Sequence, residues 1–152
     1  MQSRPNSHHW PPYLYALTMA AALGLTWGWP LAFWALPLQR WLGALLFAGG
    51  IVMGLAAIGL FRKMGTTVDP TGRASALADR GIYRFTRNPM YLGATLAYLG
   101  LGLWFGNGWL LLLTPIMALG LHHLAILREE AWLSARFGPA YVAYCARVRR
   151  WI

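Results

Sequence analysis

Residues 41–61, WLGALLFAGGIVMGLAAIGLF, decide the fold class of this chain. The run contains no charged residue, and a helix of about 20 apolar residues covers the hydrocarbon core of a bilayer. The stretch therefore predicts a transmembrane helix. A second apolar segment precedes it, from Tyr13 to about Trp29, with an extension past Pro30 to Leu36 as the alternative boundary.

Downstream, residues 89–127 form an uncharged stretch that is too long for one crossing. Gly106-Asn107-Gly108 is a turn signal in its middle, so we expect a tight hairpin of two helices. Pro115 lies in the second of these helices, where we expect a kink. The hairpin brings the expected number of transmembrane helices to about four.

Beyond residue 127 the chain becomes more polar. We expect a short helix over residues 128–137, ended by Gly138 in a left-handed cap, and a second helix that starts at Pro139. Apolar residues at helical spacing extend that last helix to Ile152 and place it along the membrane surface or over the mouth of the bundle.

Composition leads to the same class of protein. Hydrophobic residues make up 58% of the chain and charged residues 11%, whereas a soluble domain carries about a quarter charged residues. This excludes a soluble globular domain and a disordered chain. We expect an all-α, polytopic integral membrane bundle of about four transmembrane helices with C-terminal interfacial helices. Cys145 is the one cysteine, and adjacent His122 and His123 point to different helix faces, so no metal site is expected.

Charge patterning sets the expected orientation. Twelve of the 13 basic residues lie in the N-terminal tail, in residues 62–87 or from residue 128 onward, and Arg40 is the exception. Because cytoplasmic loops carry the excess of Lys and Arg, both termini and residues 62–88 are expected to lie in the cytoplasm. We expect the protein to be in a bacterial inner membrane, where these basic residues contact membrane lipids. The net charge of +9 is explained this way, and no nucleic-acid partner is expected.

Two adjacent acidic residues follow the expected fourth crossing, Glu129 and Glu130. Neighbouring residues point about 100° apart on a helix, so at most one of them faces a cavity easily. Two interpretations stay open. In the first, both carboxylates are solvated interfacial charges, one of them paired with Arg128 or Arg136. In the second, one carboxylate at the bundle mouth binds a ligand's hydroxyls or offsets its positive charge.

Two motifs carry a resemblance to a known family. The first is Gly81-x-Tyr83-x-x-x-Arg87-Asn88-Pro89-x-Tyr91, and the second is Glu129-Glu130-x-x-Leu133-x-x-x-Phe137-Gly138-x-x-Tyr141-x-x-Tyr144. In this order, on either side of a hydrophobic hairpin, they resemble the isoprenylcysteine carboxyl methyltransferase family, which is related to the membrane phospholipid methyltransferases. The resemblance covers about residues 62–152. It divides the chain into a flexible tail (1–12), two N-terminal transmembrane helices (13–61) and a methyltransferase-like core with its hairpin and C-terminal cap (62–152).

The resemblance implies a membrane methyltransferase that uses S-adenosylmethionine and acts on a lipophilic small molecule or a lipid. The implied cofactor-binding residues are Ala76, Leu77, Ala78, Tyr83, Arg87, Asn88, Pro89, Met90, Tyr91 and Glu129, and the implied catalytic residues are Arg128 and Glu130. A register slip of one residue would exchange Glu129 for Glu130 as the cofactor ligand.

Two positions depart from the family pattern. Asn88 replaces the histidine of the His-Pro motif, and Ala125 stands where the family has an arginine for the prenylcysteine carboxylate, with Arg128 nearby. The second departure predicts an acceptor other than a prenylcysteine. Two other functions remain open: an NADPH-dependent membrane reductase resembling steroid reductases, with Arg84, Arg87 and Arg128 on the 2′-phosphate, and a non-catalytic membrane scaffold. The acceptor atom and the oligomeric state stay open as well.

Overall fold

The structure is a computed structural model that describes residues 10–32, 36–65 and 76–152. Its elements are α1 (Trp10–Gly28), α2 (Pro37–Lys63), the 3₁₀ turn η2 (Gly81–Arg84), α3 (Pro89–Phe105), α4 (Gly108–Leu121), the π-helical turn η3 (His122–Ile126), α5 (Leu127–Phe137) and α6 (Pro139–Arg147). Of the tail expected at residues 1–12, residues 1–9 lie outside the described residues, as do residues 66–75 of the basic loop. Residues 10–12 belong to α1.

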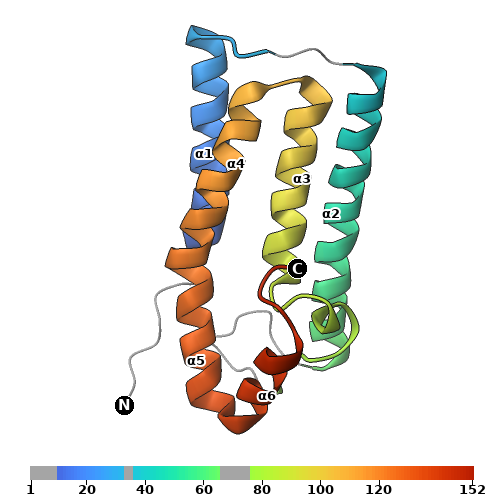
Figure 1. Cartoon of the computed structure of the whole chain (residues 1–152), viewed down its shortest axis with the longest axis vertical. Helices are drawn as coiled ribbons and strands as arrows, with labels where there is room; N and C mark the ends of the chain where they lie inside the picture. The colour runs from blue at the N-terminus through green and yellow to red at the C-terminus, as the bar shows by residue number, and fades with distance from the viewer. Residues whose placement is uncertain (1–9, 33–35, 66–75) are drawn as a thin grey trace.

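Helices α1, α2, α3 and α4 stand side by side (Figure 1). The contacts run from α1 to α4, from α4 to α3 and from α3 to α2, while α5 continues α4 beyond the end of the bundle and α6 folds back beneath it (Figure 1). The described residues form no β-strand beyond one isolated bridge, Ala32 with Asn107. The predicted all-α class is therefore confirmed.

Local signals in the sequence fix the helix ends. Proline at the first turn starts α2, α3 and α6, where its missing N–H costs nothing. Gly106 ends α3 in the left-handed region (φ 62°, ψ 30°). Asn107 starts α4 by accepting hydrogen bonds from the amides of Trp109 (3.0 Å) and Leu110 (3.1 Å). The hairpin predicted at residues 106–108 is confirmed.

The C-terminal region departs from the prediction in two places. Gly138 has the positive φ expected of it (51°), but its ψ of −125° is not that of a left-handed cap. The helix predicted to reach Ile152 ends at Arg147, because Val148 turns extended (φ −124°, ψ 129°). This extended tail takes hydrogen bonds from residues 86–88, which replace those that a longer helix would have made.

Helices α2 and α3 pack with their backbones in contact. A Cβ added at Gly43 would lie 2.6 Å from the Trp104 nitrogen, and one at Gly50 would collide with the Gly93 carbonyl and lie 2.7 Å from the Ala97 nitrogen. Small residues therefore serve close packing here, as their role in membrane helices predicts. The pair Gly24 and Gly28, which has the same spacing, faces open space instead.

This contact gives a prediction about stability. Gly50→Ala is expected to destabilise the fold by about 1–3 kcal/mol, because overpacking forces α2 and α3 apart. The matched control is Gly49→Ala, since nothing lies within 4 Å of a Cβ there. This control is expected to stabilise the fold by about 0.5–1 kcal/mol, because alanine is a better helix former than glycine. Thermal unfolding in detergent measures both, and equal midpoints for the two variants would contradict the packing.

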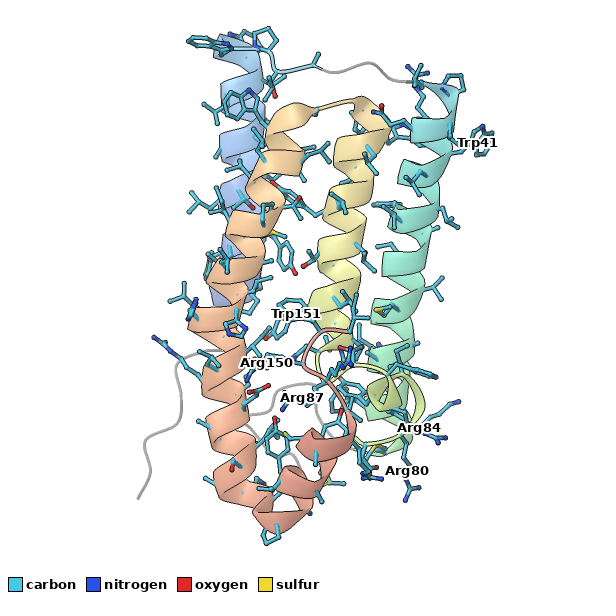
Figure 2. All side chains as sticks on the ribbon, viewed as in Figure 1. Trp41, Arg80, Arg84, Arg87, Arg150 and Trp151 are labelled. Carbon is cyan, nitrogen blue, oxygen red and sulfur yellow. The ribbon has the colours of Figure 1, made fainter. Side chains whose placement is uncertain are left out.

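The outer surface of the bundle is apolar. Among the described residues, two stretches are long and apolar enough to cross a membrane, Pro37–Lys63 and Gly108–Phe137, the latter joining α4, η3 and α5. Large hydrophobic side chains such as Leu45, Val52 and Leu55 are more than 60% exposed, which suits lipid and not water. Trp41 lies at one end of the bundle, and Arg80, Arg84, Arg87 and Arg150 lie at the other (Figure 2).

Candidate active site

A cavity of about 240 Å³ opens at the end of the bundle where these arginines lie. Five parts of the chain form its walls: the start of α1, the end of α2, the segment from residue 76 to the first turn of α3, and helices α5 and α6. The lining residues are Pro11, Pro12, Phe61, Ala76, Leu77, Ala78, Tyr83, Arg87, Asn88, Met90, Tyr91, Glu129, Glu130, Leu133, Tyr141 and Tyr144.

Most of the residues singled out from the sequence meet at this cavity. Those that line it are Ala76, Leu77, Ala78, Tyr83, Arg87, Asn88, Met90, Tyr91, Glu129 and Glu130. Pro89 is almost fully buried and starts α3. Arg128 is exposed and does not line the cavity, so the structure does not bring this predicted catalytic residue to the others.

A hydrogen bond joins the two motifs across the cavity. The Tyr91 hydroxyl, from the first turn of α3, donates to Oε1 of Glu129 on α5. The backbone carbonyl of Tyr91 accepts from the Tyr15 hydroxyl of α1 (3.2 Å), which also lies 3.3 Å from the Thr95 hydroxyl. Tyr91 is thus fixed from two sides. Sequence reasoning missed Tyr15, because only the tertiary position of α1, which packs against α4, brings this side chain to α3.

Glu130 belongs to a separate ionic cluster. Arg150 donates to both of its oxygens, from Nε to Oε1 (2.8 Å) and from Nη2 to Oε2 (2.7 Å), and Nη1 of Arg87 lies 3.4 Å from Oε1. The hydrogen bond to Glu130 raises the pKa of Arg150 above its ordinary value. Sequence reasoning missed Arg150, which is 20 residues away along the chain.

Both glutamates line the cavity, so the expectation that at most one would easily face it is wrong. More than one face of α5 borders the cavity. Glu129 contacts α3 through Tyr91, whereas Glu130 contacts the tail that follows α6 through Arg150. A difference of about 100° in direction therefore keeps both side chains on the same cavity.

Residues 86–88 hold the tail in place. The Arg87 amide donates to the Arg149 carbonyl (3.0 Å), and the side chains of Thr86 and Asn88 donate to the Arg150 carbonyl at 3.2 and 3.0 Å. The Asn88 amide group therefore supports the wall of the cavity at the position where the family has histidine.

Buried tyrosine side chains also line the cavity. Tyr83 is buried (8% exposed) and meets Phe61 edge to face, with ring centroids 5.5 Å apart. Its carbonyl accepts from the Tyr144 hydroxyl (2.8 Å). Burial raises the pKa of Tyr83 and of Tyr144 above the ordinary tyrosine value. Both phenols are therefore neutral at physiological pH and offer electron-rich ring faces to a cation.

The positions relevant to other ligands are also clear. Ala125, which stands in place of the family's carboxylate-binding arginine, is fully buried (0% exposed). Of the three arginines considered for a 2′-phosphate, Arg84 and Arg128 are exposed, and Arg87 alone lines the cavity. The three side chains do not form one phosphate site.

The fold and the cavity define a class: a helical membrane protein with an aromatic and charged site at the basic end of its bundle. The family model for phospholipid methyltransferases matches residues 38–140, from α2 to the start of α6. The chain belongs to this family of membrane methyltransferases, which confirms the resemblance seen in the motifs. The match also includes α2, which the motifs did not reach.

The chain is similar to an uncharacterized protein of Haemophilus influenzae, with 40% identity over 63 residues that cover 41% of this chain and 100% of that protein. No solved structure matches the chain.

Proposed function

We propose that this protein is an integral membrane enzyme that transfers a methyl group from S-adenosylmethionine to a small lipophilic or lipid-attached acceptor. The observation that carries the proposal is the meeting of both family motifs at one cavity, with Tyr91 hydrogen-bonded to Glu129. Family membership supports methyl transfer as the reaction class.

The residues of the cavity fit this cofactor. Glu129 offers a carboxylate to hydroxyl or ammonium groups, Arg87 offers a guanidinium to a carboxylate, and Tyr83 and Tyr91 offer aromatic faces to a sulfonium. When bound, S-adenosylmethionine supplies an already activated methyl group. The protein then has to hold donor and acceptor in line, which needs no protein nucleophile.

Part of the cavity lining is apolar, which suits a lipophilic acceptor. Pro11 and Pro12 of α1, Phe61 of α2 and Leu133 of α5 line the cavity with hydrocarbon. Since Ala125 is buried and Arg128 is exposed, neither offers a charge to an acceptor carboxylate inside the cavity. Arg87 is proposed for the cofactor, and a buried carboxylate without a partner binds poorly. We therefore propose an acceptor other than a prenylcysteine carboxylate.

The proposed arrangement has four crossings, with both termini and the basic loop in the cytoplasm. Exposed apolar residues on α1, including Leu17 (66%) and Leu23 (57%), support α1 as a crossing helix beside the two longer stretches, and α3 lies between α2 and α4 (Figure 1). We propose that residues 62–152 carry the cofactor site and residues 13–61 supply two crossing helices against it.

Cysteine labelling tests this orientation. In a Cys145→Ser background, Leu38→Cys is expected to react with a membrane-impermeant maleimide in intact cells, because Leu38 is 78% exposed at the end of the bundle with few basic residues. Arg80→Cys, in a side chain 84% exposed at the basic end, serves as the matched control and is expected to react only after lysis. The reverse pattern would overturn the orientation.

Equilibrium binding tests the activity. Detergent-purified protein is expected to bind S-adenosylhomocysteine and not NADPH, and to transfer label from S-adenosylmethionine to one member of a panel of lipid amines, phenols and thiols. Binding of NADPH alone would favour a membrane reductase, and binding of neither ligand would favour a scaffold. Strong labelling of N-acetyl-farnesylcysteine would contradict the proposed acceptor class.

A further inference from the structure

A second hollow lies at the end of the bundle far from the candidate active site. It has a volume of about 310 Å³ and is lined by Pro37, Arg40, Trp41 and Trp104. Trp41 marks this end in Figure 2, opposite the labelled arginines. Because a helix rises about 1.5 Å per residue, the part of α2 between Arg40 and Phe61 separates the hollow from the cavity by about 30 Å. A ligand bound here is therefore distinct from the cofactor.

Contacts between α2 and α3 hold the walls of this hollow together. The Gln39 side chain donates from Nε2 to the Leu103 carbonyl (2.9 Å). Gly43 approaches the backbone of α3 so closely that an added Cβ would lie 2.6 Å from the Trp104 nitrogen. The beginning of α2 and the end of α3 are thus fixed to each other, and the hollow is a preformed feature of the fold.

Arg40 has no acidic partner at this end of the bundle. Residues 1–68 contain no Asp or Glu. The described acidic side chains lie at the other end, beside Arg80 or on the walls of the cavity. An arginine on the side with few basic residues runs against the usual distribution of charge in membrane proteins. Its counter-ion has to come from outside the chain.

The two tryptophans of the hollow add hydrogen-bond donors and indicate its depth in the bilayer. The indole N–H groups of Trp41 and Trp104 and the Arg40 guanidinium find no acceptor among the described residues, and indole rings prefer the headgroup level. Toward the middle of the bundle, Leu45 and Val52 lie on the same face of α2 as Trp41 and are 69% and 66% exposed. Donors at headgroup depth therefore lead into an apolar strip that faces lipid.

We propose that this hollow binds the phosphate of an anionic phospholipid, with Arg40 and the two indole N–H groups on the phosphate oxygens and the acyl chains along Leu45 and Val52. Phosphate oxygens accept charge-assisted hydrogen bonds from such donors. An ammonium headgroup would find no carboxylate here, and a free phosphate would gain nothing from the apolar strip. The inference requires α2 to span the membrane but does not depend on methyl transfer.

Photo-cross-linking tests the site. Detergent-purified protein is illuminated with a trace of phosphatidylglycerol that carries a diazirine on its headgroup, and mass spectrometry maps the labelled peptides. The wild type is expected to be labelled near residues 37–41 and near Trp104. Arg40→Gln is expected to reduce this labelling by about 10-fold, because the charge-assisted hydrogen bonds to the phosphate are lost. Labelling at the basic end of the same molecules is expected to stay unchanged and serves as the internal reference.

Two further variants sharpen the test. Arg84→Gln is the matched control, because Arg84 is an exposed arginine at the opposite end of the bundle, and it is expected to leave the labelling near residues 37–41 unchanged. Trp104→Phe keeps an aromatic ring in the wall but removes one N–H donor, and it is expected to reduce the labelling by about 2- to 5-fold.

Unlabelled competitors identify the headgroup. Phosphatidylglycerol is expected to remove the label near residues 37–41 at about 10-fold lower concentration than phosphatidylcholine with the same acyl chains, and inorganic phosphate is expected not to compete. Equal competition by the two lipids would overturn the anionic headgroup, and competition by inorganic phosphate would assign the hollow to a free anion. Labelling that is absent from the wild type, or that survives unchanged in Arg40→Gln, would overturn the site and leave the proposed function standing.

Discussion

Glu129→Gln is expected to weaken the binding of S-adenosylhomocysteine by about 1–3 kcal/mol, or roughly 5- to 140-fold. The substitution removes the negative charge of the Glu129 carboxylate from the cavity. It also replaces a charge-assisted hydrogen bond from Tyr91 by a neutral one. Calorimetry with purified protein measures the change. Wild-type affinity in this variant would show that Glu129 is not a cofactor ligand.

Tyr91→Phe is expected to weaken the same binding by a smaller amount, about 1 kcal/mol, because the ring stays in the wall and one hydrogen bond to Glu129 is lost. Tyr13→Phe is the matched control, since Tyr13 is 66% exposed on the outside of α1. An equal effect of both substitutions would mean that Tyr91 acts through general stability and not through the site.

The ionic cluster predicts an asymmetry between its members. Glu130→Gln leaves two neighbouring arginines without their anion and is expected to cost about 1–3 kcal/mol of stability, below the value for fully buried pairs because Arg150 is 33% exposed. Arg150→Gln leaves Glu130 with Arg87 at 3.4 Å and is expected to cost about 1 kcal/mol or less.

Thermal unfolding in detergent compares these two variants with Arg147→Gln. This control changes an exposed side chain whose Nε donates to the Ala143 carbonyl one turn earlier (3.4 Å). The Glu130→Gln, Arg150→Gln double variant is expected to lose less than the sum of the single losses, because the two residues share one interaction. A larger loss of stability in Arg150→Gln than in Glu130→Gln would contradict the description of Glu130 as the anion that Arg87 and Arg150 share.

The sequence predicted those parts of the fold that depend on near neighbours. The hairpin at residues 106–108 follows from a glycine with positive φ and an asparagine that caps the next helix. The conformation of the C-terminal tail was predicted wrongly, because it depends on residues far away along the chain. Val148 and Ile152 continue a helical spacing, but the carbonyls of Arg149 and Arg150 between them accept hydrogen bonds from residues some 60 positions earlier, which hold the tail out of the helix.

The residues of the site also differ in how far they could be predicted from the sequence. The two motifs supplied most of its lining residues through the family resemblance, whereas Tyr15 and Arg150 depend on contacts between distant segments. The placement of Arg128 failed because neighbouring helical positions differ in direction by about 100°. Whether residue 128 or its neighbours face the cavity depends on the rotation of α5 about its axis, which spacing along the chain does not give.

That rotation is set by the π-helical turn η3, His122–Ile126, between α4 and α5. A π turn holds more residues than an α turn, so everything after it is rotated relative to an uninterrupted helix. Such a turn is equivalent to a one-residue insertion, and losing that residue would turn α5 by about 100°. The length of this turn is therefore constrained as tightly as its buried residues: a substitution at exposed His123 leaves Glu129 directed at Tyr91, whereas a single deletion is expected to direct it elsewhere.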